Sequence, residues 1–159
     1  MQTTLLIADD EYFIRQRLKR IIPWKELNLK LAGEAENGVE VLNHLNEQHI
    51  DIVLLDIRMP KMLGTETAQH IRQNFPETQV IILSGYNEFE YARAALQTGV
   101  SDYLLKPVDA SSLHASLEKC IEKITQRQKT TAKLLSFDRH MRSNALVDVR
   151  EGKLSLIHI

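Results

Sequence analysis

The sequence has little cysteine and no long apolar run, and each absence excludes a class of protein. A single cysteine, Cys120, in 159 residues excludes an internal disulfide and suits a reducing compartment. No apolar stretch approaches the roughly 20 residues that a membrane-spanning helix requires. The chain reaches the acidic Asp9 and Asp10 after one short apolar run, unlike a secretory signal peptide. We therefore expect a cytoplasmic protein with no membrane association.

Glycine is also scarce, and its placement excludes the common nucleotide cradles. The chain has 6 glycines, and Gly33 and Gly38 form neither a G-x-x-x-x-G-K loop nor a G-x-G-x-x-G turn. If this protein handles phosphoryl groups, the donor must therefore be another molecule and not a nucleotide bound in such a loop.

The net charge of −1 hides an asymmetry along the chain. Residues 1–118 contain 11 Lys/Arg and 17 Asp/Glu, a net of −6, whereas residues 119–153 contain 9 and 4, a net of +5. This shift indicates a change of role near residue 119, either to a solvated linker helix or to a basic segment that approaches nucleic acid. We expect one domain over residues 1–125. Residues 126–159 form a basic linker or helical extension, or begin a truncated output region.

Short apolar segments alternate with longer amphipathic ones, which is typical of an α/β protein. Predicted strands cover residues 5–8, 29–35, 52–55, 80–83 and 103–105. Predicted helices cover about residues 11–22, 38–48, 65–74, 88–97 and 110–127. Five strands each followed by a helix predict a doubly wound parallel sheet with right-handed crossovers and helices on both faces.

Acidic side chains stand where two of these strands end. Asp9 and Asp10 follow the first strand, and Asp56 closes the third. Ligands of open parallel sheets bind outside the carboxyl ends of the strands, where the strand order reverses. If the first and third strands are neighbours, the three carboxylates converge, and their repulsion calls for a cation. Mg²⁺ suits a site with few carboxylates and retained waters.

Each acidic residue alone has a simpler interpretation. Asp10 could cap the following helix, and Asp56 could open a loop. What favours chemistry is that Ser84 ends the fourth strand and Lys106 follows the fifth. Carboxylates, a metal, a hydroxyl and an ammonium together indicate phosphoryl transfer, with one carboxylate as nucleophile that forms an acyl phosphate.

Four segments, in order and at the predicted strand ends, resemble the receiver domain of two-component response regulators. They are LIADDE at 6–11, DIRMP at 56–60 with Gly64, LSGY at 83–86 and DYLLKP at 102–107. The resemblance spans residues 4–125. It implies the flavodoxin-like strand order 2-1-3-4-5 with a C-terminal helical extension, Mg²⁺ as cofactor, and a sensor histidine kinase as phosphoryl donor.

The resemblance also implies a role for each acidic residue. Asp56 corresponds to the phosphoacceptor. Asp10 corresponds to a direct Mg²⁺ ligand and Asp9 to one that acts largely through water, with the backbone carbonyl of Arg58 completing the set.

Other matching positions correspond to residues that respond to the phosphoryl group. Ser84 and Lys106 would hold its oxygens, and Tyr103 would turn inward when Ser84 moves. The Lys106–Pro107 bond matches the family's cis peptide. One departure is Lys61, in a loop where the family often has glycine.

The run SGYNEFEYARAA at residues 84–95 resembles receivers joined to AraC-type DNA-binding domains. Such a chain is a phosphorylation switch that catalyses only its own phosphorylation and dephosphorylation, not an enzyme for another substrate. We expect a phosphorylation-enhanced homodimer that binds specific DNA only through an output domain absent from this chain. Two alternatives are a phosphatase, which would want an acid where Arg58 stands, and a pseudo-receiver, which would lack the acidic pair or Lys106.

Overall fold

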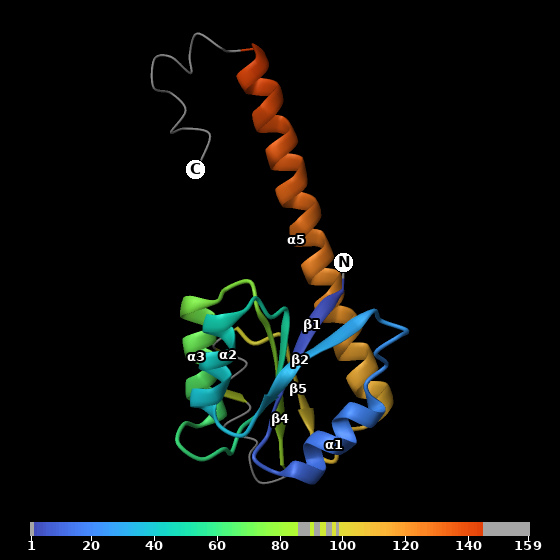
Figure 1. Ribbon diagram of the computed structural model, residues 1–159, viewed down its shortest axis with the longest axis vertical. Coiled ribbons are helices and arrows are strands. Elements are labelled where there is room, and N and C mark those ends of the chain that lie inside the picture. Colours follow the sequence, from blue (N-terminus) through green and yellow to red (C-terminus); the bar gives the residue numbers. More distant parts are fainter. Residues whose placement is uncertain (1, 86–89, 91–92, 95–96, 98, 145–159) are drawn as a thin grey trace. The chain divides into compact units, whose positions relative to one another are not determined.

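A five-stranded parallel sheet forms the centre of the protein (Figure 1). The computed structural model describes residues 2–85, 90, 93, 94, 97 and 99–144. The strands are β1 (Thr3–Ala8), β2 (Leu29–Ala35), β3 (Ile52–Asp56), β4 (Gln79–Ser84) and β5 (Asp102–Leu105). They lie in the order β2-β1-β3-β4-β5 and all pair in parallel, which confirms the predicted fold.

Helices connect the strands and cover the sheet. They are α1 (Tyr12–Ile21), α2 (Gly38–Glu47), α3 (Gly64–Asn74) and α5 (Ala110–Asn144). The helix predicted at 88–97 falls mostly outside the described residues, although Glu90, Arg93, Ala94 and Gln97 are helical. In Figure 1, α2 and α3 lie on one side of the sheet, whereas α1 lies on the other.

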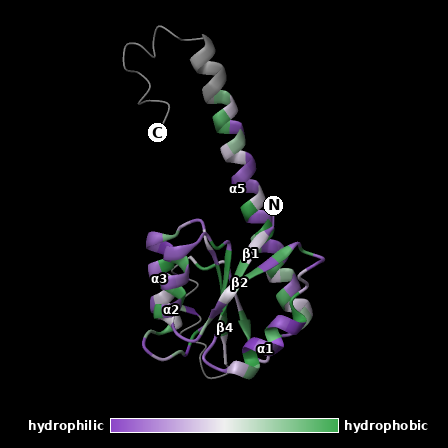
Figure 2. Ribbon diagram, in the orientation of Figure 1, coloured by the Kyte–Doolittle hydropathy of each residue, from purple (hydrophilic) through white to green (hydrophobic). Residues whose placement is uncertain are grey.

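The apolar strand segments are buried because both faces of the sheet are covered. Alternate residues face opposite sides, so Leu6 and Ala8 of β1 join the core under α2 and α3, which also contains Val41 and Ile71. In Figure 2 the central strands are mostly green or pale, whereas the helices mix purple and green. Each fully buried leucine or isoleucine stabilises the fold by about 1.5–3 kcal/mol, before the entropy lost on folding.

A β-bulge changes the pattern of β2. Leu5 of β1 pairs with Leu31, but the next residue, Leu6, pairs with Gly33, so Ala32 is an extra residue in β2. Because side chains alternate along a strand, one extra residue reverses the faces of all that follow. Glu34 therefore pairs with Ile7 and lies on the face that α1 covers.

The chain divides into two compact units, Met1–Ile121 and Glu122–Ile159. In the first, α5 buries Leu113, Leu117 and Cys120. The sequence predicts a helix to about residue 127 and then a basic linker or a helical extension; the structure continues the helix to Asn144, which confirms the helical extension. Residues 110–144 contain no glycine or proline, so nothing in the backbone chemistry stops the helix. No helix among the described residues is long and apolar enough to cross a membrane.

The loop between β3 and α3 contains an unusual backbone conformation. Lys61 has a φ of 69°, in the left-handed region that costs an L-residue roughly 1–2 kcal/mol. This is the position at which the resemblance noted above would often place glycine, which adopts that conformation without strain.

We expect Lys61→Gly to raise the free energy of unfolding by about 0.5 kcal/mol, because the relieved strain slightly exceeds the extra entropy of an unfolded glycine. Urea unfolding measures the change. Lys30→Gly is the matched control, because Lys30 is an exposed lysine in β2 and its replacement should destabilise the protein. Equal destabilisation by both substitutions would contradict the prediction.

Candidate functional site

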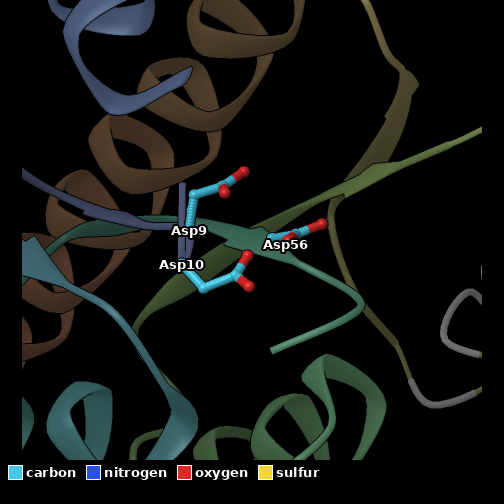
Figure 3. A group of neighbouring side chains, drawn as sticks. All are labelled: Asp9, Asp10 and Asp56. Carbon is cyan, nitrogen blue, oxygen red and sulfur yellow. The ribbon is translucent and has the colours of Figure 1, made fainter. Parts of the chain in front are cut away.

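Three carboxylates meet at the carboxyl ends of β1 and β3. These strands are neighbours in the sheet, with Ala8 of β1 beside Leu55 of β3, so the residues that follow emerge together. Each of Asp9, Asp10 and Asp56 offers an oxygen, and these atoms all lie within 4.8 Å of one another. Figure 3 shows the three side chains extending from the strand ends toward the same region. The predicted convergence of the acidic residues is thus present in the structure.

Lys106, which follows β5, brings a positive charge into contact with two of these carboxylates. Its Nζ donates to Oδ2 of Asp9 at 2.8 Å and lies 3.0 Å from Oδ1 of Asp56. Burial lowers the pKa of Lys106, but the hydrogen bond to Asp9 and the charges of Asp56 and Asp9 outweigh it and raise that pKa above its usual value. Lys106 is therefore an ammonium ion throughout the physiological pH range.

The charges of these residues sum to a net negative charge that favours a bound cation. Three carboxylates and one ammonium carry two net negative charges, which one divalent ion would neutralise. Asp9 and Asp56 are buried, whereas Asp10 is exposed and lines an open hollow with Arg58 and Met59. A ligand set made only of oxygen atoms, open to solvent on one side, fits a hard divalent ion that keeps part of its water shell.

Ser84 lies beside this cluster with an unpaired hydroxyl. Its side chain is fully buried, and its Oγ has no hydrogen-bond partner among the described residues. The backbone links it to Lys106, whose N–H donates to the Ser84 carbonyl at 2.7 Å. A buried hydroxyl without a partner costs about 1–3 kcal/mol, so such groups often serve a ligand or a function.

Two other predicted site residues occupy defined positions. Tyr103 pairs with Ile82, two residues before Ser84, so alternation puts Tyr103 and Ser84 on the same face of the sheet. Tyr103 is partly buried and packs against the core under α2 and α3. The Lys106–Pro107 peptide bond is cis.

Gly64, the first residue of α3, lies against the backbone of Asp56 and Ile57. A Cβ at this position would contact the Asp56 carbonyl oxygen and lie 2.7 Å from the Ile57 Cα. The N–H of Gly64 also donates to the Ile57 carbonyl at 2.7 Å. Only glycine therefore allows α3 to begin so close to the end of β3.

The sequence reasoning missed two charged residues behind the acidic cluster. Arg15 of α1 is buried, and its Nη1 donates to the backbone carbonyl of Asp9 at 2.8 Å. Its Nε donates to Oε1 of Glu34 at 3.0 Å. A signal was available for Arg15, which stands three residues before Leu18 and seven before Ile22, on the apolar stripe of its helix. The sequence gives no such signal for Glu34, because the bulge that turns Glu34 toward α1 cannot be recognised from the sequence.

Comparison with known protein families agrees with the fold. The model of the response regulator receiver domain matches residues 5–118. The transcriptional regulatory protein YesN of Bacillus subtilis is 37% identical over 154 residues, which is 95% of this chain and 42% of that protein. The chain spans about half the length of the curated relatives it matches.

Solved structures agree with this assignment. The receiver domain of AraT, a response regulator from Geobacillus stearothermophilus, has a TM-score of 0.76 and 38% identity, covering 80% of this chain and 99% of that one. A two-component transcriptional regulator AraC from Clostridium phytofermentans has a TM-score of 0.73 and 32% identity, covering 80% and 98%.

We expect Gly64→Ala to lower the free energy of unfolding by about 1–3 kcal/mol, because the new methyl group meets backbone that cannot move without displacing Asp56. Chemical denaturation measures the loss. Gly33→Ala is the control: its Cβ would lie 2.9 Å from the His44 ring, and moving that side chain would cost its hydrogen bond to the Glu34 carbonyl but would displace no backbone. A loss at Gly64 no greater than at Gly33 would contradict the prediction.

Proposed function

The chain belongs to the response regulator receiver family of two-component systems, and we propose that it is a magnesium-dependent switch that takes a phosphoryl group onto Asp56. The observation that carries the proposal is one cluster: Asp56 lies with Asp9 and Asp10 and within 3.0 Å of the Lys106 ammonium. The buried hydroxyl of Ser84, which has no hydrogen-bond partner among the described residues, lies beside it. These are the groups that phosphoryl transfer to a carboxylate requires.

The acidic residues would hold the metal in this proposal. Asp10, Asp56 and the backbone carbonyl of Arg58 would hold Mg²⁺, and Asp9 would hold it largely through water. Bound there, Mg²⁺ would neutralise the charge that develops on the phosphoryl oxygens. The exposed Asp10 and the hollow that it shares with Arg58 support this assignment, because the ion and its waters need access from solvent.

Phosphoryl transfer follows from the position of Asp56. A carboxylate oxygen of Asp56 attacks the phosphorus of a phosphohistidine in a sensor histidine kinase. The phosphorus–nitrogen bond breaks, the imidazole leaves with the bonding electron pair and a proton from solvent, and an acyl phosphate forms on Asp56. Lys106 then exchanges its contact with Asp56 for a phosphoryl oxygen, and Ser84 donates its unpaired hydroxyl to another.

The chain in this proposal catalyses only its own phosphorylation and dephosphorylation. A phosphatase acting on other substrates would want an acidic proton donor two residues after the nucleophile, where this chain has Arg58. A receiver reduced to a binding module would have no need for the acidic cluster or for Lys106.

The output of the switch is transcriptional in this proposal. Relatives of about twice this length include transcriptional regulatory proteins, so the signal would pass to a DNA-binding region of the AraC type beyond this chain, in the cytoplasm. Movement of Ser84 toward the phosphoryl group opens space on the face that it shares with Tyr103, which then turns inward. Ser84 and Tyr103 thus form a two-state element that phosphorylation biases.

We expect incubation with acetyl phosphate and Mg²⁺ to add the mass of one phosphoryl group to the wild-type chain, and Asp56→Asn to abolish the addition. Asp51→Asn is the control, because Asp51 is a partly buried aspartate whose carboxylate accepts hydrogen bonds from Thr4, away from the cluster. Intact-mass spectrometry measures both. An Asp56→Asn chain that gains the phosphoryl group with wild-type stoichiometry would sink the proposal.

We also expect phosphorylation to strengthen homodimerisation through the surface around β5. Leu105 supports this surface, because its large apolar side chain is 55% exposed beside the switch residues. Analytical ultracentrifugation with and without beryllofluoride should show a dimer only with the phosphoryl mimic, and Leu105→Gln should weaken it. Phe13→Gln, at an apolar residue 82% exposed on α1, should leave the dimer intact. Identical monomer profiles in both states would contradict the expectation.

A further inference from the structure

Arg15 is a charged residue buried beneath the acidic cluster, where an uncompensated charge would be costly. All three of its guanidinium nitrogens have partners. Nη1 donates to the Asp9 carbonyl at 2.8 Å, Nε to Glu34 at 3.0 Å, and Nη2 lies 3.7 Å from Oε1 of Glu36. A planar guanidinium can hold these groups in one rigid arrangement, whereas the single ammonium of lysine cannot.

Glu34 holds Arg15 in place, and a special feature of the backbone puts it there. The bulge at Ala32 turns Glu34 toward α1, where Lys19 also contacts it at 3.0 Å. The two cations lower the pKa of Glu34: burial raises this pKa, but the hydrogen bonds and charges of Lys19 and Arg15 outweigh that effect. Without the bulge, Glu34 would face α2, and Arg15 would lose its main anionic partner.

The contact between Arg15 and the Asp9 carbonyl bears directly on Asp10. A peptide unit is planar, so a hydrogen bond to the carbonyl of Asp9 also orients the N–H and Cα of Asp10. The other side of Asp9 is held as well, because its N–H donates to the Ala35 carbonyl at 3.0 Å. Asp10 is exposed, so its neighbouring peptides fix the direction of its side chain. The peptide after Asp10 is held by the Glu11 N–H, which donates to Oδ1 of Asp9 at 2.9 Å. The peptide before it is held by Arg15, so the direction of Asp10 depends in part on Arg15.

We infer that Arg15, anchored by Glu34, is a positioning residue that aims the Asp10 carboxylate at the metal and so sets the affinity for Mg²⁺. The inference rests on the proposed function. It does not assign Arg15 a contact with the metal or with the phosphoryl group. Residues that orient metal ligands from behind typically change metal affinity by about 10- to 100-fold when they are replaced.

The test is a Mg²⁺ titration of the whole chain. The NMR signals of the Asp10 amide and the Asp9 carbonyl carbon are recorded at each Mg²⁺ concentration. Lys19→Gln is the matched control, because Lys19 contacts Glu34 but not Asp9. Arg15→Gln and Lys19→Gln each remove one positive charge near the metal, so electrostatics alone would tighten Mg²⁺ binding in both. A positioning role predicts instead that Arg15→Gln weakens Mg²⁺ binding, whereas Lys19→Gln tightens it.

We expect Arg15→Gln and Arg15→Lys to weaken Mg²⁺ binding by about 10-fold or more. Both should also shift the Asp9 carbonyl signal in the metal-free protein, whereas Lys19→Gln should not. Glu34→Gln leaves Arg15 in the chain but removes its anchor, so it should also shift the Asp9 carbonyl signal in the metal-free protein; this signal is its readout, because loss of the Glu34 charge alone would weaken Mg²⁺ binding. Urea unfolding shows whether each variant is folded. If Arg15→Gln is not folded, Arg15→Lys and Glu34→Gln provide the test.

Two failures are distinguishable. Folded Arg15 and Glu34 variants that bind Mg²⁺ within about twofold of wild type, or more tightly, would overturn the positioning role and leave the proposed function intact. A wild-type chain that binds no Mg²⁺, or binds it equally after Asp56→Asn, would instead overturn the proposed function itself.

Discussion

The ion pairing of Lys106 with Asp9 and Asp56 is the interaction on which the rest of the site depends. Two buried carboxylates and a third nearby would repel one another strongly in a medium of low dielectric constant. Lys106 offsets part of this repulsion. It is 97 residues from Asp9 in the sequence, so their pairing forms only when β5 has reached its place in the sheet. Removing one partner of a buried pair is strongly destabilising, because the other charge remains buried.

The parallel sheet makes this concentration of charge possible. Its strands all point the same way, so β1, β3 and β5 end at the same edge of the sheet. This carboxyl-end edge is open to solvent and to a cation. The uniformly buried interiors of β3 and β4 hold these ends in a fixed register. Hydrophobic burial thus supplies the free energy that keeps like charges together, and the remaining negative charge would attract a divalent ion.

Much of this arrangement could be predicted from the sequence, for a physical reason. Short apolar runs identify buried strands, and the residue after a run lies at a strand end, so the sequence alone assigns Asp9, Asp56 and Lys106 to one edge of the sheet. The bulge at Ala32 could not be predicted, because a bulge depends on how two strands pair and not on local composition. The network of Arg15 and Glu34 depends on that bulge and was missed with it. The continuation of α5 beyond residue 127 was expected as a helical extension, but its end at Asn144 could not be predicted, because the weakly amphipathic sequence gives no periodic pattern that fixes it.

The same interactions explain how a small chemical change could alter the whole domain. The ammonium of Lys106 now divides its contacts between Asp9 and Asp56, and the buried hydroxyl of Ser84 has no partner among the described residues. A phosphoryl group on Asp56 would add close to two negative charges and several strong acceptors, so both groups gain better partners at the same point. Ser84 and Tyr103 share one face of a tightly packed sheet, and such packing permits a few discrete arrangements and not a continuum. In the proposed switch, a phosphoryl oxygen would give the Ser84 hydroxyl a hydrogen-bond partner that no described residue offers it, and this would favour one of those arrangements over the other.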